Sequence, residues 1–269
     1  MMNSPNADII LVVNKLSKFI DIENIMLVGA RCRDIHQQKY RDQTAGRRTK
    51  DVDFALALES WDDFNLLKQQ FSPTGNAWQG ITIGNIPVDL VPFGNIENPP
   101  GEVLSRKGHL LNVAGFKEVF EQAELYPLND AIDIKLPTVP GLTALKLHAW
   151  LDRKENNIKD ASDLALILSW YEEDVETLWN RYFALENQGY IGEPEAMAAE
   201  LLGLDTGRIL DHKETQALLD RFNEQSPPEL NQFAESLEAP PEHSHPLERR
   251  RIQVEALLGG LRDSLGYDE

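Results

Sequence analysis

The chain has 269 residues, and its 42% hydrophobic, 26% charged and 8% aromatic residues give an ordinary globular composition with ample material for a core. Its 44 Asp and Glu outnumber 26 Lys and Arg, and the formal net charge of -18 excludes a generally basic nucleic-acid-binding module, because such a molecule repels phosphate backbones. A single cysteine, Cys32, excludes an intramolecular disulfide, and no apolar stretch reaches the roughly 18 residues of a membrane helix. We therefore expect a cytoplasmic protein without a membrane span or a signal peptide.

The two halves of the chain differ in charge. Residues 161–269 contain 8 Lys and Arg against 23 Asp and Glu, a net charge of -15, whereas residues 1–160 contain 18 against 21, a net charge of -3. Within the first half, residues 31–50 contain seven basic and only two acidic side chains. This basic segment has two interpretations, a solvated loop or a site that binds anions.

The apolar periodicity also changes along the chain. The first half alternates helical and extended segments. In chain order, we predict a helix over 9–20, strands over 25–28 and 51–58, and a helix that follows Trp61 and extends to Phe71. Two further strands, over 81–83 and 86–91, are joined by a tight turn at Gly84 and Asn85. From Pro140 onward the helical period dominates. We predict a mixed α/β domain over residues 1–135, followed by an all-helical domain over residues 136–269 that becomes acidic towards its C-terminus.

Acidic side chains mark two of the predicted strands. Asp51 and Asp53 are two positions apart, so a strand places both on one face, with Cα atoms about 6.6–6.8 Å apart. Asp89 is a lone acid in the apolar strand IPVDLV, where an unpaired charge is costly unless a cation meets it. Carboxylate oxygens are ligands that Mg²⁺ prefers, usually together with substrate phosphates.

Each acid taken alone has a structural interpretation. Asp51 and Asp53 would form a polar entrance to a strand, and Asp89 would form a salt bridge with one of the seven basic residues of the 31–50 segment. Together the three favour a metal centre, in which acids on neighbouring strands hold two Mg²⁺ ions, or Mn²⁺ in their place, for in-line phosphoryl or nucleotidyl transfer.

The order of these motifs resembles a known superfamily. The segment from Leu27 to Ala30, followed by Asp51-Val52-Asp53 and then Asp89, is similar to the signature of polymerase-beta-type nucleotidyltransferases: a strand, a small Gly-containing turn, a helix and a strand with two acids. Further along, LKLHAWLDR over 145–153 and KDASDL over 159–164 resemble later motifs of the AbiEii-type nucleotidyltransferases of bacterial toxin-antitoxin and phage-defence systems. The resemblance spans residues 25–171, and residues 172–269 match no pattern that we identify.

This resemblance implies a fold, a reaction and a site. The fold is a mixed-sheet, polymerase-beta-like core followed by the helical domain. The reaction is Mg²⁺-dependent transfer of a nucleoside monophosphate from an NTP to an acceptor hydroxyl, with release of pyrophosphate. The implied catalytic residues are Asp51, Asp53 and Asp89, which would hold the metal ions, Lys146, which would contact the nucleotide phosphates, and Asp160, which would act near the acceptor as a base or orienter.

The nucleotide-binding turn departs from the family pattern. The family usually has Gly-Gly or Gly-Ser there, whereas this chain has Gly29-Ala30 followed by Arg31. Alanine has no hydroxyl to offer a triphosphate, but backbone N–H groups at the start of a helix bind anions without any side chain. We therefore expect Gly29, Ala30 and Arg31, together with Arg48 of the basic segment, to bind the nucleotide.

The resemblance leaves alternatives open. The acceptor is tRNA, a protein hydroxyl or a small molecule of the aminoglycoside type, and a cognate antitoxin is the expected protein partner. A catalytically degenerate module that binds a nucleotide or a partner is the competing class of function. Among single residues, Lys146 also fits a surface lysine on an amphipathic helix, and His148 fits a packed or hydrogen-bonded histidine. Helix capping explains at least one of Asp160 and Asp163, and Asp163 fits it better, at the helix start or against Arg153.

Overall fold

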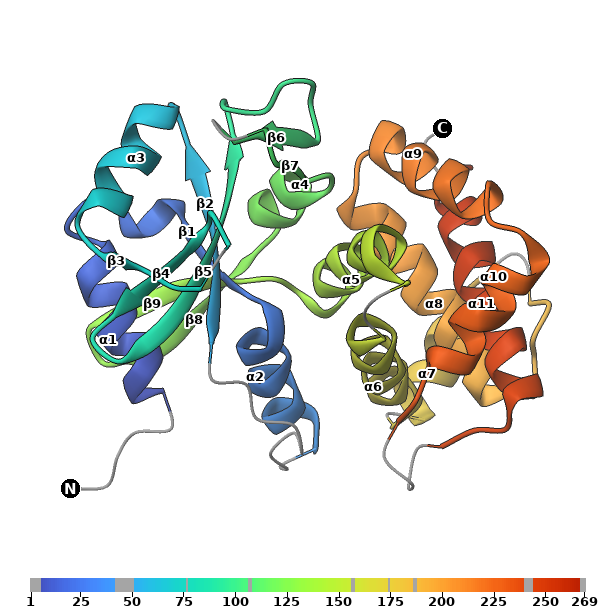
Figure 1. Ribbon diagram of the computed structural model, residues 1–269. Coiled ribbons are helices and arrows are strands. Elements are labelled where there is room, and N and C mark those ends of the chain that lie inside the picture. The colour runs from blue at the N-terminus through green and yellow to red at the C-terminus, as the bar shows by residue number, and fades with distance from the viewer. Residues whose placement is uncertain are drawn as a thin grey trace. The chain divides into compact units, whose positions relative to one another are not determined.

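The computed structural model describes residues 6–41, 51–75, 77–105, 108–155, 158–173, 175–185, 188–239 and 244–266. The chain divides into two compact units, Met1–Thr138 and Val139–Glu269 (Figure 1). The first unit contains a mixed sheet with helices and the second is helical, so the predicted fold class is confirmed.

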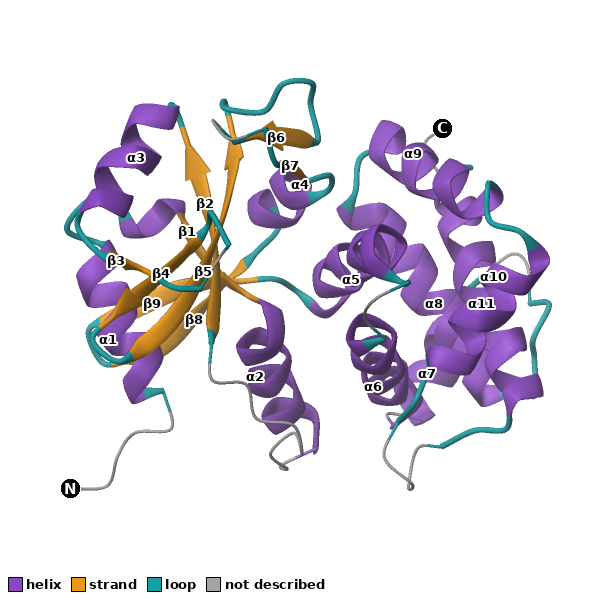
Figure 2. Cartoon of the chain, viewed as in Figure 1, coloured by secondary structure: helices purple, strands orange, loops and turns teal. Residues whose placement is uncertain are grey.

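The first unit is built on a seven-stranded sheet in the order β3-β4-β5-β2-β1-β9-β8 (Figure 2). These strands are β1 (Ile25–Val28), β2 (Val52–Leu58), β3 (Ser72–Pro73), β4 (Gly80–Ile83), β5 (Ile86–Gly94), β8 (Glu124–Asn129) and β9 (Ile132–Leu136). A separate two-stranded ribbon consists of β6 (Glu102–Leu104) and β7 (Leu110–Asn112). The helices of this unit are α1 (Ala7–Leu16), α2 (Gly29–Arg41), α3 (Trp61–Gln69) and α4 (Phe116–Glu121), with a 3-10 turn, η1, at Ile22–Asn24.

The centre of this sheet mixes parallel and antiparallel pairs. Strand β2 pairs antiparallel with β1 and parallel with β5, whereas β1 pairs in parallel with β9. Strands β4 and β5 form the predicted hairpin, with Ile83 opposite Ile86 and the turn at Gly84 in the left-handed region. Alternate residues of β2, among them Val52, Phe54 and Leu56, are fully buried, which leaves Asp53 on the opposite face.

Several features of this unit differ from the sequence-based expectation, among them the unpredicted β3, β6, β7 and α4. Residues 31–41 of the basic segment belong to helix α2, and Arg33 is buried, so the interpretation of that part as a solvated loop is wrong. Strands β8 and β9 extend the sheet although no strand was predicted there. Strand β8 is an edge strand with mostly exposed residues and a proline at position 127, and such a strand carries a weak periodic signal.

The second unit contains seven described helices. They are α5 (Val139–Arg153), α6 (Lys159–Glu173), α7 (Val175–Tyr182), α8 (Pro194–Ile209), α9 (His212–Asn223), α10 (Pro227–Ser236) and α11 (Leu247–Ser264). Most residues of α8 are buried, and Trp150 of α5 packs against Phe222 of α9 and Phe233 of α10. In the described parts of the chain, no helix has both the length and the apolar character required to cross a bilayer.

Helices α8 and α11 cross at glycines. A Cβ atom on Gly203 would lie 2.0 Å from the Leu257 carbonyl oxygen, and a Cβ atom on Gly260 would lie 2.0 Å from the Glu200 carbonyl oxygen. Both obstructing atoms belong to backbone, which cannot rotate away as a side chain can. The close approach of the two helices therefore depends on the absence of side chains at these positions.

His148 of α5 is a buried histidine in the same unit. Its Nδ1 lies 3.1 Å from Nη1 of Arg221, and its Nε2 lies 3.3 Å from Oε1 of Glu214. Burial, with a further contribution from the positive charge of Arg221, lowers the pKa of His148 from 6.5 to about 3. The imidazole is therefore neutral at pH 7, and the interpretation of His148 as a packed, hydrogen-bonded histidine is confirmed.

We predict that Gly260→Ala destabilises the protein by about 3 kcal/mol or more, because the added methyl group must push two helix backbones apart. The adjacent Gly259 is the matched control, because a Cβ atom there meets nothing within 4 Å. Gly259→Ala should be neutral or stabilising by up to about 1 kcal/mol, since alanine is the better helix former. Urea unfolding of both variants measures the difference, and equal stabilities would contradict the close crossing.

We predict that His148 makes the protein less stable as the pH falls. Its pKa is lower in the folded state than in the unfolded state, so the unfolded chain binds a proton first and stability is lost as pH falls from 6.5 towards 3. Between pH 7 and pH 5 this residue should account for about 2 kcal/mol of the loss.

Urea unfolding at both pH values should show a smaller loss for His148→Asn than for the wild type. His212→Asn, which removes an exposed histidine, is the control and should follow the wild type. An acid loss in His148→Asn as large as that of the wild type would show that His148 is not the group responsible.

Candidate functional site

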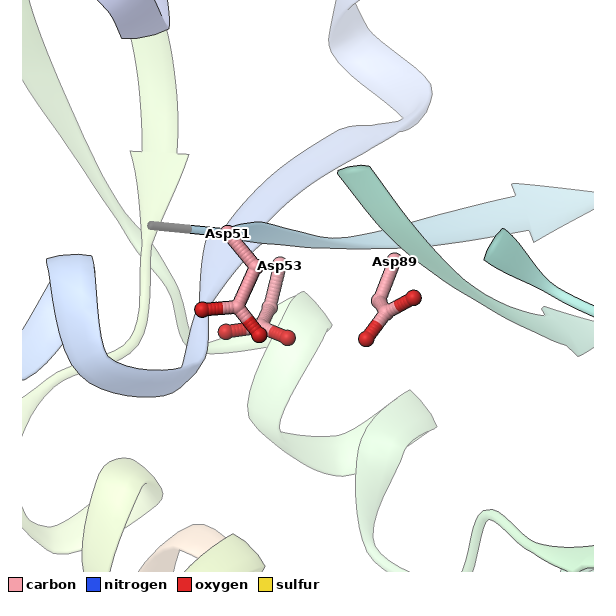
Figure 3. A group of neighbouring side chains, drawn as sticks. All are labelled: Asp51, Asp53 and Asp89. Carbon is pink, nitrogen blue, oxygen red and sulfur yellow. The ribbon is translucent and has the colours of Figure 1, made fainter. Parts of the chain in front are cut away.

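Three aspartates of the first unit converge at one point. Asp51 directly precedes β2, Asp53 lies within β2, and Asp89 lies opposite Asp53 on the parallel neighbour β5. Each offers a carboxylate oxygen, and these oxygens all lie within 4.8 Å of one another. Figure 3 shows the three side chains pointing to the same side of the strands. Alternation along β2 and the register with β5 thus bring together the acids that the sequence singled out.

Gly29, the first residue of α2, provides the space for one of these carboxylates. Its φ of +66° lies in the left-handed region, and a Cβ atom on it would stand 2.1 Å from Oδ2 of Asp53. A larger residue at this position would therefore be strained and would also displace the carboxylate. The glycine of the predicted nucleotide-binding turn is in this way tied directly to the acidic group.

The electrostatics of the group favour a bound cation. The three acids are half-buried, and burial of Asp89, with a further contribution from the charge of Asp51, raises the pKa of the Asp89 carboxyl. A divalent ion would offset the repulsion between the carboxylates. Three carboxylate oxygens within reach of one another are a donor set that fits Mg²⁺ or Mn²⁺.

The remaining residues predicted to bind the nucleotide have different surroundings. Ala30 is buried in the first turn of α2. Arg31 donates a hydrogen bond from Nη2 to Oδ1 of Asp8, at 2.8 Å, and both side chains are partly exposed. The structure therefore places Arg31 in an ion pair with the first turn of α1. Arg48 lies outside the described residues.

Lys146 lies in the second unit, in an ion cluster between α5 and α6. Its Nζ is 3.0 Å from Oδ1 of Asp160 and 2.7 Å from Oδ2 of Asp163, and all three residues are buried. Arg153 also binds Asp160, from Nε at 2.7 Å and from Nη2 at 3.0 Å. Burial alone would lower the pKa of Lys146, but attraction to Asp163 and Asp160 outweighs burial and raises it. The interpretation of Lys146 as an ordinary surface lysine is wrong.

Two partners in these ion pairs were missed as candidate site residues. Asp163 follows Asp160 at i+3, a spacing that puts both carboxylates on the same face of α6, so the KDxxD pattern itself contained the signal. Asp8 lies 23 residues before its partner Arg31, and nothing in the local sequence connects them.

We predict that Asp89→Asn raises the melting temperature of the metal-free protein by a few degrees at pH 7. The raised pKa means that ionised Asp89 is disfavoured in the folded state, so its ionisation lowers stability as pH rises above the ordinary carboxyl value of 3.8. The gain should shrink as the pH falls towards that value, because wild-type Asp89 then carries a proton.

Added Mg²⁺ should stabilise the wild type, but Asp89→Asn much less. Asp130→Asn is the charge-matched control, because Asp130 is an exposed residue in the turn between β8 and β9. Differential scanning fluorimetry in EDTA and in millimolar Mg²⁺ measures both effects. An undiminished Mg²⁺ response in Asp89→Asn would remove Asp89 from the metal centre.

Comparison with known proteins identifies the family. The family model described as nucleotidyl transferase AbiEii toxin, type IV TA system, matches residues 97–248, more than half of the chain. The match begins after the three aspartates and contains Lys146 and Asp160. It also contains helices α7 to α10, so it extends beyond residue 171, where the motif resemblance ended. No curated protein matches the chain. The chain belongs to the AbiEii nucleotidyltransferase toxin family of type IV toxin-antitoxin systems.

Proposed function

We propose that the protein is a Mg²⁺-dependent nucleotidyltransferase that transfers a nucleoside monophosphate from an NTP to an acceptor hydroxyl. The observation that carries this proposal is the convergence of Asp51, Asp53 and Asp89 in a member of the AbiEii family. In the transfer, a bond forms between the acceptor oxygen and the α-phosphorus, and the bond to the pyrophosphate oxygen breaks. When bound, two divalent ions stabilise the attacking and leaving oxygens of such an in-line displacement.

The three aspartates have distinct tasks in this proposal. Asp51 and Asp53 hold the metal ions from one face of β2, and Asp89 completes the group from β5. Asp89 also accepts the proton of the attacking hydroxyl. In the metal-free protein, burial and the charge of Asp51 raise the pKa of the Asp89 carboxyl, and a bound divalent ion would offset that effect.

The start of α2 is the proposed location of the triphosphate. A helix of 13 residues directs unpaired N–H groups and the positive end of its dipole to its N-terminus, which attracts anions. Gly29 stands at this end, against Asp53, so phosphates bound there would adjoin the metal ions. Arg31 and Arg48 add positive charge, and Arg31 would exchange Asp8 for a phosphate oxygen.

Lys146 and Asp160 retain the roles that the family resemblance implies, phosphate binding and action near the acceptor. Support comes from their place within the matched region. Their mutual ion pair, with Asp163 as the second partner of Lys146, would fix the direction of the ammonium group. A role in catalysis then predicts that Lys146→Met lowers turnover even where the protein stays folded.

The proposal names the acceptor only by its chemical class. A tRNA end, a protein hydroxyl and a small-molecule hydroxyl are the candidates, and a cognate antitoxin is the proposed regulator. The net charge of -18 favours an acceptor bound through a limited surface over one that needs a broad RNA footprint. A nucleotide-binding module without transfer is the second candidate function, favoured by Ala30, which lacks a hydroxyl for the triphosphate.

Transfer is tested with the full chain, Mg²⁺ and each of the four NTPs labelled at the α-phosphate. Total tRNA, a lysate protein fraction and an aminoglycoside are supplied as separate acceptors. We predict transfer of label to one acceptor class together with pyrophosphate release, and a loss of both by about 10²-fold or more in Asp53→Asn, because that carboxylate neutralises charge in the transition state.

Asp130→Asn is again the control and should keep wild-type rates. Calorimetric titration with the nucleotide and Mg²⁺ should show binding under either candidate function, and the transfer assay separates the two, since only the transferase consumes the NTP. Label transfer that persists in EDTA, or in Asp53→Asn at the wild-type rate, would contradict the proposed function.

A further inference from the structure

Gly80 occupies a second position at which the acidic group requires a residue without a side chain. It is the first residue of β4 and lies directly opposite Asp89 of β5 in the antiparallel register. A Cβ atom on Gly80 would lie 2.7 Å from the Thr74 carbonyl oxygen and 3.3 Å from Oδ1 of Asp89. Both distances are shorter than ordinary contacts of a Cβ atom.

The backbone at Gly80 does not itself require glycine. The glycines with φ in the left-handed region include Gly29 and Gly84, but not Gly80. Any residue could adopt its extended conformation, and β4 continues with Ile81, Thr82 and Ile83. The requirement at this position is therefore one of space.

The strand register explains why that space matters for Asp89. The Leu90 N–H donates to the Gln79 carbonyl, so the hydrogen bonds flank the pair of Gly80 and Asp89 rather than joining it. Residues opposed in this way have Cα atoms about 4.5 Å apart and bring their side chains closest together. A side chain at position 80 would meet the Asp89 side chain across the strands.

The space left by Gly80 allows the Asp89 side chain to adopt its observed orientation. Figure 3 shows the Asp89 carboxylate with one oxygen on the side of Asp51 and Asp53 and the other on the far side. Mg²⁺ demands near-octahedral geometry with ligands at about 2.0–2.1 Å, so a shift of a few tenths of an ångström in one carboxylate weakens binding.

We propose that Gly80 is a positioning residue of the metal centre, whose missing side chain leaves the room in which the Asp89 carboxylate turns towards Asp51 and Asp53. This inference rests on the proposed function, because it assumes that the three acids bind a divalent ion. Gly29 makes room for Asp53 in the same manner. Two of the three carboxylates therefore lie next to glycines of neighbouring elements, where a side chain would contact them.

The test is Gly80→Ala in the full chain, with Mn²⁺ as the probe and its affinity measured from the electron paramagnetic resonance of the free ion. We expect about 10–100-fold weaker Mn²⁺ binding, the range found when residues that orient metal ligands are changed. Gly84→Ala, at the other end of β4, is the matched control. Its φ is +64° and its Cβ atom would meet only Leu11, at 3.8 Å, so it strains the same hairpin without approaching the acids.

A double-mutant cycle with Asp89→Ala separates the two contacts of position 80. Once the Asp89 carboxylate is gone, Gly80→Ala should weaken Mn²⁺ binding no further, whereas the loss of stability due to Thr74 should persist. If Gly80→Ala alone fails to fold, recovery of folding in the double variant supports the contact with Asp89. If the double variant also fails to fold, the proposal is overturned, because the clash with the Thr74 carbonyl oxygen then accounts for the effect of Gly80→Ala.

Failure of this inference and failure of the proposed function give different results. A wild type that binds Mn²⁺, together with a Gly80→Ala variant that binds it equally well, overturns only the role of Gly80. A wild type that does not bind Mn²⁺ overturns the proposed function. In that case, melting temperatures in EDTA of the wild type, Gly80→Ala, Asp89→Ala and the double variant still measure the coupling between positions 80 and 89. Additive shifts in melting temperature would overturn the steric contact as well.

Discussion

Three carboxylates held close together repel one another, and the pairing of two strands is the constraint that keeps them in place. Parallel pairing of β2 with β5 puts Asp53 opposite Asp89, and the two-residue period of β2 adds Asp51 on the same face. Seven consecutive register pairs join these strands, so the acids cannot separate by sliding without loss of the ladder. The raised pKa of Asp89, due to burial and to Asp51, shows that the sheet holds the acids against an electrostatic penalty.

The helical unit resolves the burial of acids differently. Asp160 and Asp163 are nearly inaccessible, yet Lys146 and Arg153 lie against them as two cations supplied by the chain. There, attraction outweighs burial and raises the pKa of Lys146. At the sheet, the charge of Asp51 instead adds to the effect of burial on Asp89, and both raise the pKa of the Asp89 carboxyl. A divalent cation held by the three carboxylates would relieve this repulsion.

The sequence predicted those parts of the site that depend on local periodicity. Alternation places Asp51 and Asp53 on one face, and an i, i+3 spacing places Asp160 and Asp163 on one face of α6. Asp89 joins the first pair only through the long-range parallel pairing of β2 with β5. Contacts between segments distant in the chain were not predictable in this way. The pair of Arg31 with Asp8 and the addition of β8 and β9 to the sheet depend on tertiary packing. An exposed edge strand with a proline has no apolar alternation to reveal it.

The departure from the family pattern at Ala30 affects one part of the site only. Motif comparison assigns Gly29 to phosphate binding, whereas the structure gives a second reason for glycine there, because Asp53 fills the space of its missing side chain. That contact is independent of residue 30, which is buried and contributes packing within the first turn of α2. The missing hydroxyl at Ala30 would therefore affect only the proposed nucleotide binding, whereas Gly29 and Gly80 leave the space that the Asp53 and Asp89 carboxylates occupy.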